Sequence, residues 1–197
     1  MNDQTATPSP KSAEILKAAH TLFMEQGYGA TSMDAVAARA GVSKRTIYAH
    51  FESKNALFSE MMRAACERIG GADFADGGGD LEPTPRVFLE RYGKGFVSII
   101  NSPEGVSVHR LVVHEAERFP ELAAAFFETG PQRMIDALEE RLADFSASGA
   151  LSVDDPKYAA WLFLSMLKGQ EHLERVLAMR DMAGPEETAV YVGRVVD

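Results

Sequence analysis

The stretch from Thr31 to Phe51, TSMDAVAARAGVSKRTIYAHF, limits the possible folds of this chain more than any other. Its pattern predicts two short helices separated by a tight turn at Gly41. Glycine favours the left-handed conformation that ends a helix, and Ser43 is a suitable N-cap for the second helix. We expect Thr31 to cap the first helix by accepting a hydrogen bond from the amide near Asp34. Two short helices joined by a tight turn form a helix-turn-helix.

The second of these helices has two faces of different chemistry. Ile47 and Phe51 lie four residues apart, so both are expected to point into a core. The other face carries side chains that bond phosphate oxygens or base edges, near a helix N-terminus that favours anions. Between Val36 and Lys54 there are four basic residues and one acidic residue, although the whole chain has a net charge of −9. This local excess predicts a surface that binds double-stranded DNA.

The residues expected to contact DNA are Thr31, Ser32, Lys44, Arg45, Thr46, Tyr48, His50 and Lys54. Arg45 and Thr46 are expected to read bases. The residues expected to contact phosphates are Thr31, Lys44, Tyr48, His50 and Lys54. A bidentate contact from Arg45 to guanine would contribute about 1 to 3 kcal/mol of discrimination. The alternative for Arg45 is an ordinary solvated arginine.

Residues 15–62, ILKAAHTLFMEQGYGATSMDAVAARAGVSKRTIYAHFESKNALFSEMM, resemble the TetR family of transcriptional repressors. The resemblance implies an all-helical homodimer with one DNA-binding domain per subunit and a larger, divergent ligand-binding and dimerisation domain. Residues 109–128, HRLVVHEAERFPELAAAFFE, are similar to the C-terminal domain of the AcrR- and AefR-like branch. By the same resemblance, helices near residues 154–180 and 185–197 would pair with their symmetry mates in the dimer.

Helical periodicity continues through the rest of the chain, so we predict an all-α fold. The expected organisation is a flexible arm at residues 1–9, the helix-turn-helix domain at 10–56, and a helical ligand-binding and dimerisation domain at 57–197. A glycine-rich connector is expected at residues 70–85. Gly130 and Pro131 should interrupt a helix that begins at Pro120. The valine-rich segment at 185–196 is predicted to be helical because Val192 and Val196 share a face.

Composition excludes several classes of protein. Residues 1–60 hold six basic and six acidic side chains, and the remainder holds fourteen basic and twenty-three acidic ones, so one surface alone suits DNA. No apolar run is long enough for a membrane span and no signal sequence is evident, so we expect a cytoplasmic protein. The single cysteine, Cys66, excludes an internal disulfide framework and is expected to fill a core.

A pocket for a small-molecule effector is expected in the second domain. The residues expected to line it are Phe88, Tyr92, Phe96, His109, Met134, Trp161 and Met166. Aromatic and thioether side chains suit a flat or apolar ligand, although the same residues at helical spacing are also typical of a plain core. A ligand could bind more tightly to a dimer whose two DNA-binding domains are wrongly spaced for the operator. It would then weaken DNA binding by the difference between its affinities for the two dimer conformations. The sequence is equally compatible with a regulator that activates transcription.

The alternative class is a metal-dependent helical enzyme. His114 and Glu115 begin like the zinc-protease pattern HExxH, but position 118 is arginine, so the second ligand is missing. His109, His114 and His172 would have to meet in space to bind a metal. No cofactor is predicted. A third alternative is a protein adaptor whose second domain has no cavity.

Overall fold

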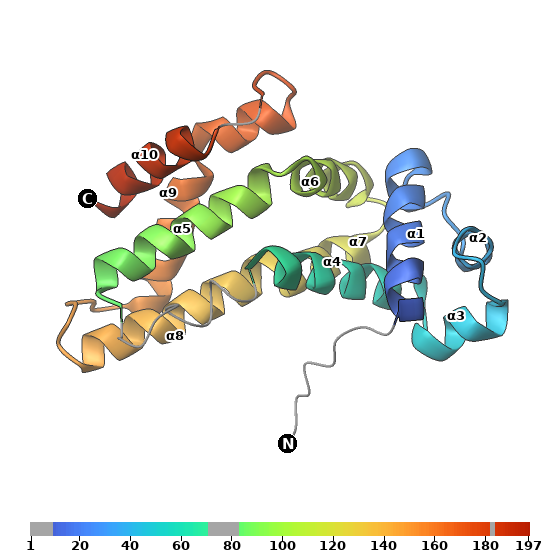
Figure 1. Ribbon diagram of the computed structural model, residues 1–197, viewed down its shortest axis with the longest axis horizontal. Helices are drawn as coiled ribbons and strands as arrows, with labels where there is room; N and C mark the ends of the chain where they lie inside the picture. The colour runs from blue at the N-terminus through green and yellow to red at the C-terminus, as the bar shows by residue number, and fades with distance from the viewer. Residues whose placement is uncertain (1–9, 71–82, 182–183) are drawn as a thin grey trace. The chain divides into compact units, whose positions relative to one another are not determined.

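The computed structural model describes residues 10–70, 83–181 and 184–197, with side chains throughout except at residues 65–70. The predicted arm at 1–9, most of the connector at 70–85 and the side chain of Cys66 lie outside this description. Every regular element of the described residues is helical, which confirms the all-α prediction. None of these helices combines the length and apolar character needed to cross a bilayer. The helices in chain order (Figure 1) are α1 (Pro10–Gln26), α2 (Met33–Arg39), α3 (Lys44–His50), α4 (Lys54–Gly70), α5 (Pro85–Asn101), α6 (Pro103–Glu115), α7 (Pro120–Phe127), η1 (Glu128–Gln132), α8 (Arg133–Ala147), α9 (Pro156–Val176) and α10 (Pro185–Val196).

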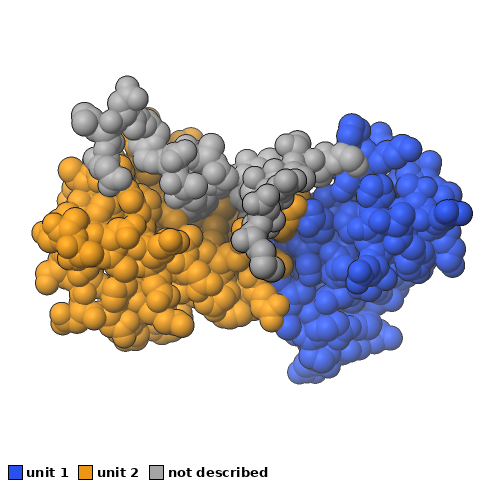
Figure 2. Space-filling view, turned by 90° about the horizontal axis from the view of Figure 1, so that it is seen from below, with its two compact units in different colours: residues 1–62, 111–126 blue, residues 63–110, 127–197 orange. Residues whose placement is uncertain are grey.

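Packing divides the chain into two compact units, which Figure 2 shows in different colours. Unit 1 comprises Met1–Met62 and Leu111–Phe126, and unit 2 comprises Arg63–Arg110 and Phe127–Asp197. The sequence indicated a single boundary near residue 56. The structure differs because residues 111–126 pack with the N-terminal helices, so that α4 and α6 each contribute to both units.

In unit 1, the helix-turn-helix forms through local caps. Ser32, and not Thr31 as expected, caps α2, because its Oγ accepts a hydrogen bond from the amide of Ala35 at 3.1 Å. Gly41 ends this helix with φ +66°, and the amide of Val42 donates to the carbonyl of Ala37 at 3.0 Å. This is the hydrogen-bond pattern of a glycine C-cap, so the predicted turn is present.

In unit 2, helices α5, α8, α9 and α10 enclose one hydrophobic core. Its buried members are Phe88, Tyr92, Phe96, Val97, Ile135, Leu138, Leu142, Phe145, Ala160, Phe163, Leu164, Leu167 and Val192. The predicted interruption near Pro131 is a π-helical segment, Glu128–Gln132, between α7 and α8. The valine-rich C-terminal segment is helix α10, as predicted.

Helix α9 has a break at Gly169, where φ is 46° and ψ is −167°. The hydroxyl of Tyr191 in α10 donates to the carbonyl of Met166 at 2.6 Å, one turn before the break. A Cβ atom at Gly169 would collide with that hydroxyl. The break therefore requires glycine for two reasons: the positive φ and the close approach of Tyr191.

Candidate nucleic-acid interface

Helix α3 is anchored by one face and exposed on the other. Ile47 and Phe51 are buried in unit 1, as the sequence predicted. Ser43 caps the helix, since its Oγ accepts from the amide of Thr46 at 3.1 Å. The side chains turned to solvent are those of Lys44, Arg45, Tyr48 and His50. Helical geometry places Lys44, Arg45 and Tyr48 on one accessible face of α3, whereas His50 projects from another side near the end of the helix.

The cations near this face differ in their partners. Nζ of Lys44 lies 2.9 Å from Oδ2 of Asp34, and this hydrogen bond raises the pKa of Lys44. Arg39 pairs with Glu25 at 2.8 Å. Arg45 has no ion pair with any residue in the described part of the chain. Exposed pairs contribute only up to about 1 kcal/mol, so a phosphate can replace Asp34 at Lys44.

Two expected phosphate contacts are corrected by the structure. The side chain of Thr31 is only 2% exposed, and its hydroxyl donates to the carbonyl of Gly27 at 2.8 Å. Nζ of Lys54 donates to the carbonyls of Tyr28 and Thr31, at 2.7 and 2.9 Å. Both side chains therefore bond backbone carbonyls within unit 1. The reason is the turn at residues 27–31, whose carbonyls point toward the start of α4.

A cluster of Tyr28, Lys54, Glu115 and Phe119, here the Lys54 cluster, holds this turn. Nζ of Lys54 lies 4.3 Å from the centroid of the Tyr28 ring, which packs edge-on against Phe119 at 5.3 Å. Burial is the main cause that raises the pKa of Tyr28 to about 12, and partial burial lowers the pKa of Lys54. The cluster therefore joins the α1–α2 turn, α4 and the α6–α7 segment within unit 1.

Glycine lets the α6–α7 segment approach this turn closely. The amide of Gly29 donates to Oε1 of Glu115 at 3.2 Å. A Cβ atom at Gly29 would lie 2.9 Å from the ring of Phe119. The sequence analysis did not assign Glu115 this role. The available signal was an acidic residue that continues the apolar stripe of Leu111 and Val112 by one helical turn, and Glu115 is indeed buried.

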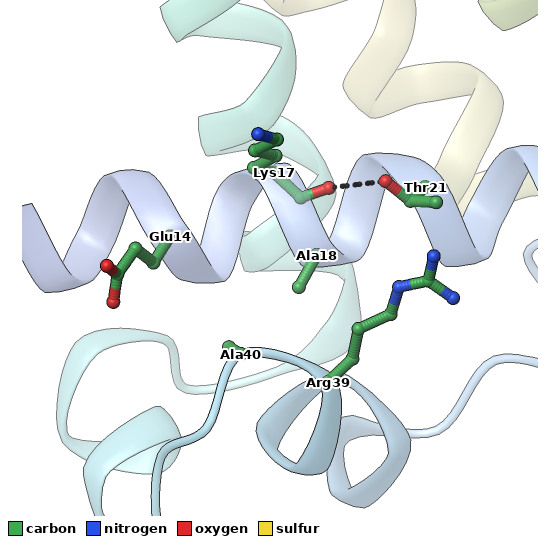
Figure 3. Close-up of a pocket in the computed structure, with 6 residues that line it drawn as sticks. All are labelled: Glu14, Lys17, Ala18, Thr21, Arg39 and Ala40. Atoms are coloured by element: carbon green, nitrogen blue, oxygen red, sulfur yellow. Dashed lines mark hydrogen bonds between the residues drawn. The ribbon is translucent and has the colours of Figure 1, made fainter.

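A surface hollow of about 400 Å³ lies between α1 and the end of α2 (Figure 3). Its lining residues are Glu14, Lys17, Ala18, Thr21, Arg39 and Ala40. Small side chains at Ala18 and Ala40 leave space between the helices, while charged groups form the rim. Such a hollow is unlike the apolar pocket expected for the effector.

The residues predicted to line an effector pocket do not form one enclosed group. Phe88, Tyr92 and Phe96 belong to the core of unit 2, and the hydroxyl of Tyr92 donates to the carbonyl of Met134 at 2.5 Å. Burial raises the pKa of Tyr92. In contrast, Trp161 is 50% exposed and Met166 is 45% exposed. Both side chains therefore lie outside the buried core of unit 2, although Trp161 lines a surface hollow of about 340 Å³ together with Phe127 and Ile135.

His109 meets His172 and not His114. Nδ1 of His109 lies 2.8 Å from Nε2 of His172, whose Nδ1 lies 3.1 Å from Oδ1 of Asn101. Burial lowers the pKa of His172 to about 4, assisted by His109, Lys168 and Arg175. Burial also lowers the pKa of His109. Both rings are therefore neutral near pH 7 and form a hydrogen-bonded chain.

The structure does not support the proposed three-histidine metal site. Within the described residues, no group of three or more His, Cys, Asp or Glu side chains is arranged to hold a metal ion. His114 is exposed in unit 1, whereas His109 and His172 lie in unit 2. The three histidines on which the alternative of a metal-dependent enzyme rested therefore do not form a metal site.

A capped helix that follows a glycine turn, with its apolar side buried and its polar, cationic side in solvent, defines a helix-turn-helix DNA-binding protein. Comparisons with known proteins identify the family. Residues 15–61 match the sequence profile described as bacterial regulatory proteins, tetR family, and residues 88–197 match that of the AefR-like transcriptional repressor, C-terminal domain. The chain belongs to the TetR family of DNA-binding transcriptional regulators. This family is not enzymatic, which confirms the expectation that the chain is not an enzyme.

Relatives of known sequence or structure agree with this assignment. The HTH-type transcriptional regulator YhgD of Bacillus subtilis (strain 168) is 29% identical over 157 residues, which span 77% of this chain and 78% of YhgD. The structure of the flavonoid-responsive regulator FrrA is 36% identical with a TM-score of 0.71, covering 92% of this chain and 91% of FrrA. A putative TetR-family regulator from Mesorhizobium loti MAFF303099 has a TM-score of 0.77 at 24% identity, over 97% of this chain and 95% of that one. This last likeness shows the fold alone.

Replacing Lys54 by methionine should lower the free energy of unfolding by about 2 kcal/mol, because two carbonyls lose a charged donor while the apolar stem is kept. Urea denaturation followed by circular dichroism measures the change. Lys17→Met, at an exposed position of α1, is the matched control and should have little effect. Equal losses in the two variants would contradict the assigned role of Lys54.

Stability should also depend on the protonation of His172. Its folded-state pKa of about 4 lies below the ordinary value of 6.5, so the unfolded chain binds the proton more readily and stability falls as pH drops below 6.5. Between pH 7.5 and 5.5 the wild type should lose about 1.4 kcal/mol more than His172→Gln. Urea denaturation of both proteins at each pH tests this. Identical losses would show that His172 does not titrate as described.

Proposed function

We propose that the protein represses transcription by binding a palindromic double-stranded DNA operator as a homodimer in the cytoplasm. A small apolar or aromatic effector releases it from DNA. The observation that carries this proposal is the exposed polar face of α3, fixed in unit 1 by the burial of Ile47 and Phe51. A single such helix contacts few base pairs, so two copies read half-sites about 34 to 36 Å apart, or a multiple of that distance.

Each group on this face has a role in the proposed complex. Lys44, Tyr48 and His50 contact phosphates, and Ser32 adds the N-terminus of α2. Arg45 and Thr46 read base edges. Arg45 is the strongest candidate because its guanidinium has no ion pair with a described residue. Phosphate contacts supply much of the affinity, so binding should weaken as the salt concentration rises.

The homodimer is supported by an apolar stripe on α9. Its exposed members in α9 are Tyr158, Trp161, Leu162, Met166 and Leu173, with Leu177 directly after the helix and Val190 in α10. Before the break at Gly169, spacings of three and four residues place Tyr158, Trp161, Leu162 and Met166 on one side of α9, and Leu173 lies beyond the break. Contiguous exposed apolar surface of this kind marks an interface. The stripe explains why Trp161 and Met166 face outward: in the dimer, the symmetry-related helix covers them.

The effector part of the proposal rests on unit 2 and on a relative. FrrA is described as flavonoid-responsive, and the core of unit 2 is rich in aromatic and aliphatic side chains. Helix α6 begins in unit 2 and ends in unit 1 at Glu115, which bonds the amide of Gly29. A ligand-dependent shift of α6 would therefore reach the α1–α2 turn. Tenfold weaker DNA binding requires a coupling free energy of about 1.4 kcal/mol.

Arg45→Ala should weaken binding to the operator at least tenfold, because a bidentate base contact is lost. The operator is first selected from random DNA with the wild-type protein, and affinity is then measured by fluorescence anisotropy. Arg133→Ala, an exposed arginine of α8 in unit 2, is the control and should bind normally. Helical content and mass must match the wild type. Unchanged operator affinity in Arg45→Ala would refute the assignment of α3 as the reading helix.

Leu173→Glu combined with Trp161→Glu should convert the dimer to monomers at micromolar concentration, because two charges would be buried in an apolar interface. Sedimentation equilibrium measures the association constant. Lys157→Glu changes charge on the same helix, outside the stripe, and serves as the control. If the wild type is monomeric, or if the double variant dimerises normally, the proposed interface is wrong.

A further inference from the structure

Arg175, near the end of α9, is a buried cation with two unused donors. Its side chain is 3% exposed. Nη1 donates to the carbonyl of Glu171 at 3.2 Å and lies 3.7 Å from the Glu171 carboxylate. Nε and Nη2 are shielded from solvent and have no hydrogen-bond partner among the residues that the structure describes. The guanidinium is thus satisfied on one side only.

The two unused donors lie on the same edge of the guanidinium. Nε and Nη2 present parallel N–H groups, and this fork matches the two oxygens of a carboxylate. A buried N–H group without an acceptor is unfavourable, and such groups are rare in folded proteins. A carboxylate in the plane of this edge would satisfy both donors at once and would compensate the buried charge.

Two described neighbours, His172 and Arg110, do not supply that acceptor. His172 lies one helical turn before Arg175, but its two ring nitrogens already bond Asn101 and His109. Arg110 donates to the backbone carbonyls of Arg175 and Val176 at 2.6 and 2.7 Å, so it adds another positive charge near the end of α9.

The charges around the site favour an anion. Lys168 and Arg175 both act on His172, and the two histidines are neutral near pH 7. Glu171 is the acidic group in contact with the guanidinium, and it lies on the Nη1 side, away from the unused edge. One negative charge placed at Nε and Nη2 would therefore meet donors and positive potential.

We propose that the Nε–Nη2 edge of Arg175 binds the carboxylate of a small organic acid. The hydrogen-bonded chain from Asn101 through His172 to His109 is neutral and leaves the charge of Arg175 for the ligand. The role of this acid as the effector rests on the proposed function, whereas its binding to Arg175 does not.

The test uses the full-length protein and pairs of probes that differ in charge but not in shape. Benzoate, cinnamate, octanoate and decanoate are each compared with their amides, and inorganic phosphate is the second kind of anion. Calorimetry and thermal melting should show binding of at least one acid and no binding of its amide. The inference fails if no acid binds, if acid and amide bind alike, or if phosphate alone binds.

Variants connect the binding to the guanidinium. Arg175→Met should weaken binding of the acid at least tenfold, and Arg133→Met, at an exposed position, should bind it as the wild type does. Arg175→Lys keeps the charge but removes the fork, so it should also lose at least tenfold, and it replaces Arg175→Met if that variant does not fold. Wild-type affinity in a folded Arg175 variant would overturn the assignment.

DNA binding separates this inference from the proposed function. If the wild type binds its selected operator, the acid should release it, and folded Arg175→Met should bind the operator without being released. If the wild type binds no DNA, the proposed function fails while acid binding can still be measured. If the acid binds at Arg175 but leaves the operator complex unchanged, the site stands and its role as the effector site is wrong.

Discussion

The hydrogen bonds from the Lys54 ammonium fix the turn at residues 27–31 against α4 in unit 1. One positive group satisfies carbonyls of Tyr28 and Thr31, packs over the Tyr28 ring and lies beside Phe119. It thereby joins the end of α1, the start of α2, the start of α4 and the α6–α7 segment. Helix α3 belongs to the same unit, because Ile47 and Phe51 are buried in its core.

Pairing among the charges determines which cations remain for DNA. An excess of basic residues around the helix-turn-helix is visible in the sequence, but most of them have intramolecular partners: Arg39 pairs with Glu25, and Lys44 pairs with Asp34. Such exposed pairs are weak and can be exchanged for phosphates. Arg45 has no such partner among the described residues. The cations that can bind DNA are therefore confined to one surface, although the net charge of the whole chain is −9.

Local signals predicted the elements well, and long-range packing accounts for what they missed. The glycine turn, the Ser43 cap and the buried face of α3 follow from residues close together in the chain. Thr31 and Lys54 were misassigned because their partners are backbone carbonyls, whose direction no residue type reveals. The outward placement of Trp161 and Met166 was missed for a related reason, since an apolar stripe that faces a core has the same periodicity as one that faces a second subunit.

By itself, the sequence determined the all-helical fold and the helix-turn-helix, because caps, glycine turns and helical periodicity are properties of neighbouring residues. Its resemblance to the TetR family over residues 15–62 was likewise visible without a structure. Tertiary structure alone decided that Glu115 bonds Gly29, that His109 bonds His172, and that one edge of Arg175 is buried without an acceptor from the described part of the chain. These contacts join residues distant in the chain, and their hydrogen bonds depend on ångström-scale distances and on burial. Only packing in three dimensions sets those quantities.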